Sequence, residues 1–172
     1  RDLRMSRGLG DVYKRQILMR NDLPSMNVGK AIAQASHASA QLIDNYYKTH
    51  NGEPYIIHWL NEGKGFGTTV VLEGSKDSIK KIVSNVKNKS YCHYNGAVID
   101  TTYPFKAQKE LLDIGNFDKY NIQIVDDTID KFGMITCTRV EHTCSYLFVA
   151  VTDEEQEEFK KLCEEYNIYL HR

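Results

Sequence analysis

Residues 17–42 read ILMRNDLPSMNVGKAIAQASHASAQL and predict a buried strand followed by a helix that packs on a sheet. Ile17–Met19 form a short apolar run, which can begin as early as Tyr13, and the polar and proline residues after it predict a loop. Residues 29–48 predict a helix with small side chains along one face, which lets it lie close to a sheet. That face consists of Ala31, Ala35, Ala38 and Leu42.

A second stripe on the same predicted helix is polar and consists of Lys30, Gln34 and His37. Lys30 lies in the first turn, where a cation faces the positive end of the helix dipole at a cost of a few tenths of a kcal/mol. Such a lysine is favoured if it meets an anion, because helix N-termini attract phosphates; the alternative is a solvated surface lysine. The pair Gly29-Lys30 is not a phosphate loop, since the earlier glycine and the following Ser or Thr are missing.

Further along the chain, apolar runs with strand character alternate with helical patterns. β-Branched residues and short continuous apolar runs predict the strands, and a capping serine or threonine before an apolar periodic segment predicts the helices. The predicted strands after the first are residues 68–72, 97–99 and 146–151, and the predicted helices after the first begin near Ser75 and Thr152. The pattern of residues 105–133 is ambiguous; a short helix near residues 107–112 and a strand at residues 122–125 are one interpretation of it.

This alternation predicts an α/β fold in a single domain. Strands that alternate with helices imply a mixed, mostly parallel sheet, here of four strands, flanked by helices on both faces in three layers. The domain is predicted over residues 13–172, with an insertion at about residues 105–137. Residues 1–12 are expected to be a non-native or disordered segment, because the chain start lacks periodicity and is similar to a translated sequencing-adapter peptide.

The charge balance does not favour a general nucleic-acid surface. The formal net charge is −1. The first sixteen residues hold five basic and two acidic residues, so the remainder has 17 basic and 21 acidic residues, a net charge of −4. Because proteins that bind nucleic acid are usually basic, any RNA contact here is expected to be a local patch.

Cysteine usage and hydropathy predict a soluble cytoplasmic protein. The four cysteines form no CxxC pair, which predicts free thiols in a reducing compartment. Neither a membrane span of roughly 18 apolar residues nor a signal-peptide core is expected. A zinc site is an alternative, but the spacing of its candidate ligands matches no standard pair, so no metal is expected. Those candidates are Cys92, His93, Cys137, His142 and Cys144.

Candidate site residues follow the predicted strands, at the carboxyl ends where open α/β sheets bind ligands. Asp22 follows the first strand and leads to Lys30, and Asp100 ends the third strand. An aspartate in that position also suits a purely structural Asx turn. Asp126 and Asp127 end another predicted strand in the same manner and are rivals to Asp100. No GxSxG nucleophile elbow occurs.

The sequence RNDLPSMNVGKAIAQASHASAQL contains an R-x-D-L turn and then G-K-x-x-A-Q-x-x-H-A. In this it resembles the opening of type II peptidyl-tRNA hydrolases. A Trp-Leu pair, a glycine loop, a β-branched strand and an amphipathic helix continue that family's order of elements. The resemblance covers roughly residues 13–104 and resumes at about residues 138–165. The positions that fill the pattern are Gly29, Lys30, Ala33, Gln34, His37 and Ala38.

The resemblance implies hydrolysis of the ester between a peptide and the terminal ribose of tRNA, with no metal or cofactor. It implies that Asp100 orients or deprotonates a water, and that Lys30 neutralises the oxyanion or binds a phosphate. The expected hydroxyl donors are Thr102, Thr143 and Ser145. The expected substrate-binding residues are Asp22, Gln34, His37, Ser145 and Lys106, with Lys64 and Lys109 as further RNA contacts.

The chain also departs from the family pattern. The usual third strand ends in aspartate, Ala-Gly and a threonine four positions on, whereas this chain has VIDTTYPF. The sequence D-x-T-Y-P, the insertion and the strand HTCSYLFV are similar to a divergent, phage-borne branch. The altered loop leaves a second hypothesis open, a catalytically inactive tRNA- or protein-binding module of the same fold. The oligomeric state stays open, with a homodimer as one alternative.

Overall fold

The computed structural model describes residues 12–49, 54–62, 65, 67–112 and 121–170. Within them, helices separate most of the strands along the chain, as predicted, but α1 is followed directly by a second helix and β4 directly by β5. The strands are β1 (Val12–Arg20), β2 (Thr69–Gly74), β3 (Cys92–Gln108), β4 (Gln123–Asp126), β5 (Met134–Val151) and β6 (Tyr169–Leu170). The helices are α1 (Val28–Thr49), α2 (Tyr55–Glu62), α3 (Lys76–Val86), α4 (Lys109–Leu112) and α5 (Asp153–Glu165).

The sheet has the strand order β3-β5-β1-β2-β6, and β4 pairs with β5 outside this path. Among the described strands, β1 and β2 are parallel and the other pairs are antiparallel. The prediction of a mixed sheet is therefore confirmed, but the prediction of four mostly parallel strands is wrong. Pairings between distant segments decide strand order, and local sequence patterns do not report them.

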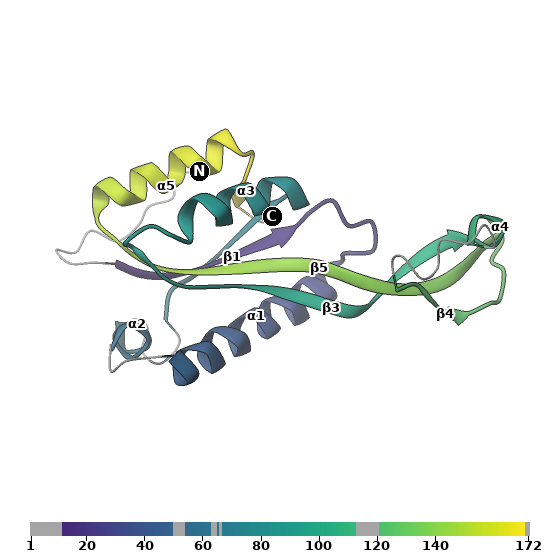
Figure 1. The fold of residues 1–172 in the computed structure, drawn as a ribbon, viewed down its shortest axis with the longest axis horizontal. Coiled ribbons are helices and arrows are strands. Elements are labelled where there is room, and N and C mark those ends of the chain that lie inside the picture. Colours follow the sequence, from purple (N-terminus) through teal and green to yellow (C-terminus); the bar gives the residue numbers. More distant parts are fainter. Residues whose placement is uncertain (1–11, 50–53, 63–64, 66, 113–120, 171–172) are drawn as a thin grey trace.

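Helices cover both faces of the sheet, which confirms the three-layer α/β architecture (Figure 1). On one face, α1 and α2 pack against apolar side chains of β1, β3 and β5. On the other face, α3 and α5 pack on a second cluster that includes Leu18, Leu147 and Val149. Side chains of alternate residues along each strand thus pack into two separate cores, one on each face, as expected for a sheet that is buried on both sides.

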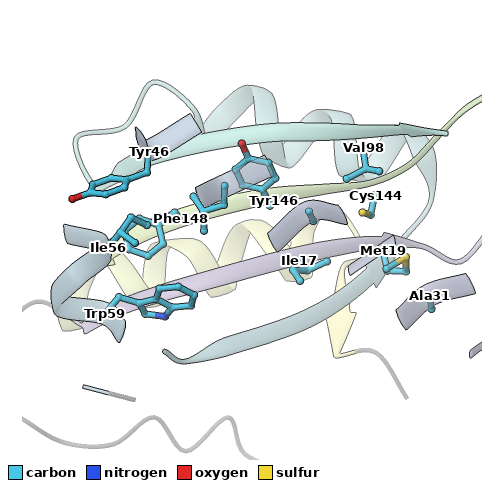
Figure 2. Close-up of a cluster of buried hydrophobic side chains, with 12 residues drawn as sticks. Ile17, Met19, Ala31, Tyr46, Ile56, Trp59, Val98, Cys144, Tyr146 and Phe148 are labelled. Carbon is cyan, nitrogen blue, oxygen red and sulfur yellow. The ribbon is translucent and has the colours of Figure 1, made fainter. Parts of the chain in front are cut away.

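The first core fixes α1 against the sheet (Figure 2). Trp59 meets Phe148 edge-to-face at a centroid distance of 5.6 Å, and apolar side chains extend from there to Ala31 at the start of α1. The stripe of small residues predicted for this helix faces the sheet: Ala31 is 7% exposed, and Ala38 and Leu42 are fully buried. Because the close packing reaches the first turn, it also fixes the position of the neighbouring Lys30.

Beyond Pro104, β3 and β5 leave the sheet as a two-stranded ribbon, and β4 and α4 add to it. We call residues 105–112 and 121–137 the arm. Its own small cluster contains Leu112, Ile135 and Cys137, and it projects away from the helices (Figure 1). The short helix and the strand predicted in this segment are confirmed as α4 and β4. That residues 105–137 are an insertion in a domain of residues 13–172 stays a prediction, and residues 1–11 lie outside the described part of the chain.

Candidate active site

Helix α1 begins beside the end of β1 and presents Lys30 in its first turn, as predicted. Asn27 caps the helix, and its side-chain oxygen accepts a hydrogen bond from the amide of Lys30 at 3.0 Å. Ala31, the next residue, packs into the core beside Met19 (Figure 2). The ammonium of Lys30 lies over the ring of Tyr103, 5.1 Å from its centroid. The helix start is thus held against both β1 and β3.

One helical turn after Lys30, the buried side chain of Gln34 joins α1 to β3 and β5. Its Nε2 donates a hydrogen bond to Oδ2 of Asp100 at 3.1 Å, and its Oε1 accepts one from the hydroxyl of Thr143 at 2.8 Å. Oδ1 of Asp100 accepts hydrogen bonds from the amide of Thr102 at 2.9 Å and from its hydroxyl at 3.3 Å. Both carboxylate oxygens are therefore held in one orientation.

Two β-bulges between β3 and β5 turn these side chains toward α1. Asp100 and Tyr103 are three residues apart, a spacing that places side chains of a regular strand on opposite faces. Between them β3 gains one residue relative to β5, and both side chains meet α1. At a second register shift Thr143 is the extra residue of β5, and its hydroxyl reaches Gln34. Bulges commonly re-aim side chains in this way beside functional sites.

The segment that holds most of these residues matches a known family. Residues 13–104, which are 92 of the 172 residues, match the family model described as peptidyl-tRNA hydrolase PTH2. The chain belongs to this family. The resemblance to this family is therefore confirmed over residues 13–104, and the protein is an ester hydrolase of the peptidyl-tRNA class. The likeness at residues 138–165 and to a phage-borne branch stays a prediction. The matched segment includes Lys30, Gln34, Asp100 and Thr102 and ends at Pro104, where the arm begins. No curated protein sequence matches the chain significantly.

In this family member Asp100 lies beside a cluster of charged side chains. Its register partner on β5 is Glu141, which is only 6% exposed. The carboxylate of Glu141 lies 2.5 Å from Nη1 of Arg20, 3.1 Å from Nζ of Lys76 and 2.9 Å from Nη2 of Arg139. Burial opposes the charge of Glu141, but hydrogen bonds from Lys76 and Arg20 outweigh it and hold its pKa below the ordinary value.

Asp22, an expected substrate-binding residue, is part of the same cluster. It accepts a hydrogen bond from Nε of Arg20 at 2.7 Å and one from the amide of Lys76 at 3.1 Å. Burial raises the pKa of Asp22, but these hydrogen bonds lower it by more, so the pKa lies below its ordinary value. The carboxylate thus joins the end of β1 to the start of α3.

The other predicted residues are spread over the molecule. His37 is exposed one turn beyond Gln34, whereas Ser145 is 3% exposed and lies 2.9 Å from Nε2 of His142. Ser145 pairs with Leu18 of the second core, so it faces α3 rather than α1. On the arm, Lys106 pairs with Asp130 at 3.4 Å and Lys109 is exposed in α4, while Lys64 lies outside the described residues.

The rival aspartates lie on the arm. Asp126 accepts a hydrogen bond from the amide of Thr128 at 2.9 Å, as in an Asx turn. All four cysteines are free, as predicted. Among the described residues, no group of three or more His, Cys, Asp or Glu side chains is arranged to hold a metal ion. No helix in the described part of the chain is both long and apolar enough to span a membrane.

Two residues of the site, Tyr103 and Glu141, have no signal in the local sequence. Tyr103 is 1% exposed and supports Lys30, but a bulge decides the face on which it lies, and no local pattern announces that bulge. Glu141 occurs in a segment of polar and apolar residues, RVEHTC, in which nothing distinguishes a buried carboxylate from a solvated one. Strand β5 lies between β1 and β3. Both strands nevertheless run in the same direction.

Proposed function

We propose that this protein hydrolyses the ester bond of peptidyl-tRNA with Asp100 as the water-steering carboxylate and Lys30 as the cation that balances developing negative charge. One observation carries the proposal. Gln34 ties Asp100 to α1 at 3.1 Å, one turn from Lys30, in a segment that matches the hydrolase family. Lys30 contacts Tyr103 three residues beyond Asp100, which supports a single site for both side chains.

The reaction is acyl transfer to water. Asp100 takes a proton from a water as that water attacks the carbonyl carbon of the ester. The carbonyl oxygen becomes an oxyanion, and the ammonium of Lys30 balances its charge. When the intermediate collapses, the bond to the ribose oxygen breaks and that oxygen receives the proton from Asp100. The products are free tRNA and a peptide carboxylic acid, which loses its remaining proton to bulk water.

The hydroxyl groups have different proposed roles because their exposure differs. Thr102 is exposed and lies at the carboxylate of Asp100, so its hydroxyl is placed to contact the ester or the water. Thr143 is fully buried and donates to Gln34, so it orients the glutamine. His37, exposed on the same stripe of α1, is proposed to contact the terminal nucleotides. Roles for Asp22, Ser145 and Lys106 in substrate binding stay predictions.

Turnover of peptidyl-tRNA by the purified full chain tests the proposed activity. We expect release of free tRNA at a rate well above that of the spontaneous reaction, over many turnovers. Binding of tRNA without release of peptide would contradict the proposal and favour the inactive binding module that the altered loop after Asp100 left open.

Gln34 offers a test of how Asp100 is positioned. Replacing Gln34 by leucine removes the hydrogen bond to Asp100, while the hydroxyl of Thr143 keeps the carbonyl of Val98 as an acceptor at 3.3 Å. We expect kcat to fall by roughly 10–100-fold because small displacements of a reacting group are costly, and stability to fall by about 1 kcal/mol.

The matched control is Gln41→Leu, at an exposed position of the same helix, which should change neither kcat nor stability measurably. A positioning role predicts a change in kcat with little change in KM. Equal kcat values for the two variants would show that the Gln34–Asp100 hydrogen bond is not used.

A further inference from the structure

The segment around α3 has a local excess of positive charge. Residues 75–90 contain five lysines and one aspartate, a net charge of +4, in a chain whose net charge is −1. The neighbouring α5 has seven acidic residues and two lysines, a net charge of −5. One face of the molecule thus has a basic helix beside an acidic one, and RNA binding requires such a local excess of positive charge.

The lysines of α3 are not evenly distributed around the helix. Ile79, Ile82 and Val86 are fully buried against the sheet. Asn85 donates a hydrogen bond to the hydroxyl of Tyr166, the C-cap of α5, at 3.1 Å, and this fixes one flank of α3 toward α5. Residues that are four and eleven positions apart lie on the same side of a helix. Three lysines have this spacing, and their side is opposite to Asn85, so it is the flank away from α5. We call it the lysine flank: Lys76, Lys80 and Lys87.

The lysine flank begins one strand away from Asp100, on the face of the sheet opposite to α1. Nζ of Lys76 lies 3.1 Å from Glu141, and Glu141 is the register partner of Asp100. Burial lowers the pKa of His142, and the nearby positive charges of Arg20, Lys76 and Lys80 lower it further. A backbone hydrogen bond raises this pKa but does not cancel the lowering. Lys80 follows Lys76 by one helical turn and therefore lies on the same side of α3. Lys76 forms an ion pair with Glu141. Lys80 and Lys87 are exposed and form no ion pair with the residues that the structure describes.

The strand beside this flank is also open to solvent. Ala97 and Ile99 pair with Ser145 and His142 of β5, on the face of the sheet that carries α3, and Ile99 is 49% exposed. Helix α3 packs on β1 and β5, and Ala97 and Ile99 of β3 are exposed. Among the described strands, β3 is at the edge of the sheet, so a strand of RNA can pass from the lysine flank around this edge to Asp100, whose side chain lies on the α1 face.

We propose that the lysine flank binds phosphates of the tRNA acceptor arm and leads its 3′ end to Asp100. The inference rests on the proposed function, because it takes peptidyl-tRNA as the substrate. The helix has 11 residues and is about 16 Å long, which spans several phosphates of one strand. The acidic surface of α5 repels the same backbone, so the two helices together fix the direction in which the RNA lies.

The test compares two double variants that change the net charge equally. One is Lys80→Gln with Lys87→Gln, and the control is Lys131→Gln on the arm with Lys161→Gln on α5. Binding of deacylated tRNA to the full chain is measured at several salt concentrations. We expect the flank variant to raise Kd roughly 10-fold and to reduce the slope of log K against log salt by about 2. The control should bind like the unmodified protein.

Equal weakening by both double variants, or by neither, overturns the inference, since the effect would then be one of net charge or of another surface. Hydrolysis separates this failure from failure of the proposed function. If the unmodified protein turns over peptidyl-tRNA but the flank variant has the same KM, the inference alone is wrong. If the unmodified protein has no turnover, the proposed function is wrong, whatever the binding data show.

Discussion

Replacing Asp100 by asparagine is expected to lower kcat for peptidyl-tRNA hydrolysis by about 10²–10⁴-fold, the usual loss when a general base is removed. Asparagine keeps the shape of the side chain and can still accept the hydrogen bond from the amide of Thr102. The fold should therefore be retained, with a loss of stability of about 1 kcal/mol or less. Single-turnover rates and a thermal melt measure the two effects.

The matched control for Asp100→Asn is Asp126→Asn. Asp126 is exposed on the arm and was the rival candidate from the sequence. We expect Asp126→Asn to leave turnover unchanged. A large loss of turnover in Asp126→Asn together with an active Asp100→Asn variant would move the site to the arm.

Glu141→Ala is expected to cause the largest loss of stability among the substitutions considered. It removes the carboxylate shared by Arg20, Lys76 and Arg139 and leaves Arg20, which is 6% exposed, with Asp22 as its remaining ion-pair partner. Removing one partner of a buried pair costs about 3–5 kcal/mol. We expect about 3 kcal/mol, because Lys76 and Arg139 reach solvent, and a Tm lower by about 6–12 °C.

The control is Glu158→Ala, which removes an exposed ion pair with Lys89 at 2.7 Å and should cost about 1 kcal/mol or less. Equal melting temperatures for the two variants would show that the charged cluster around Glu141 does not stabilise the fold.

The same carboxylate predicts a pH dependence. The pKa of Glu141 lies below its ordinary value, so its contribution to stability is complete above the pKa of an unfolded glutamate, about 4.3. The contribution is lost as the pH falls through the lower pKa of the folded protein. The difference in Tm between the unmodified protein and Glu141→Gln should therefore be largest near neutral pH and shrink below about pH 4. A constant difference down to pH 3 would contradict this account.

The sequence predicted those features that depend on local periodicity. The helical period placed Lys30 and Gln34 on one stripe of α1 and the small residues on the face toward the sheet, and the structure has both. Caps and apolar periodicity likewise located α3 and α5. These signals are contained within a few turns of one helix, so they can be read without knowledge of the rest of the chain.

What the sequence did not predict depends on pairing between distant strands. Strand β3 was expected to end at Asp100, but it continues to Gln108 because β5 pairs with it far beyond the sheet. The faces of Tyr103 and Thr143 depend on two bulges, and each bulge exists only in the register of the two strands. The contacts of Glu141 join β1, α3 and β5, which are up to 121 positions apart. Local patterns contain no information about such contacts.

A double-variant cycle in single-turnover hydrolysis is the most direct test of the central claim, that Lys30 and Asp100 serve one bound ester. The rates of Lys30→Gln, Asp100→Asn and the double variant are compared with that of the unmodified protein at saturating enzyme. Residues that act on the same step are strongly non-additive, so the double variant should be only slightly slower than Asp100→Asn alone. A double variant slower by the full product of the two single effects would contradict the account and place the two residues in independent roles.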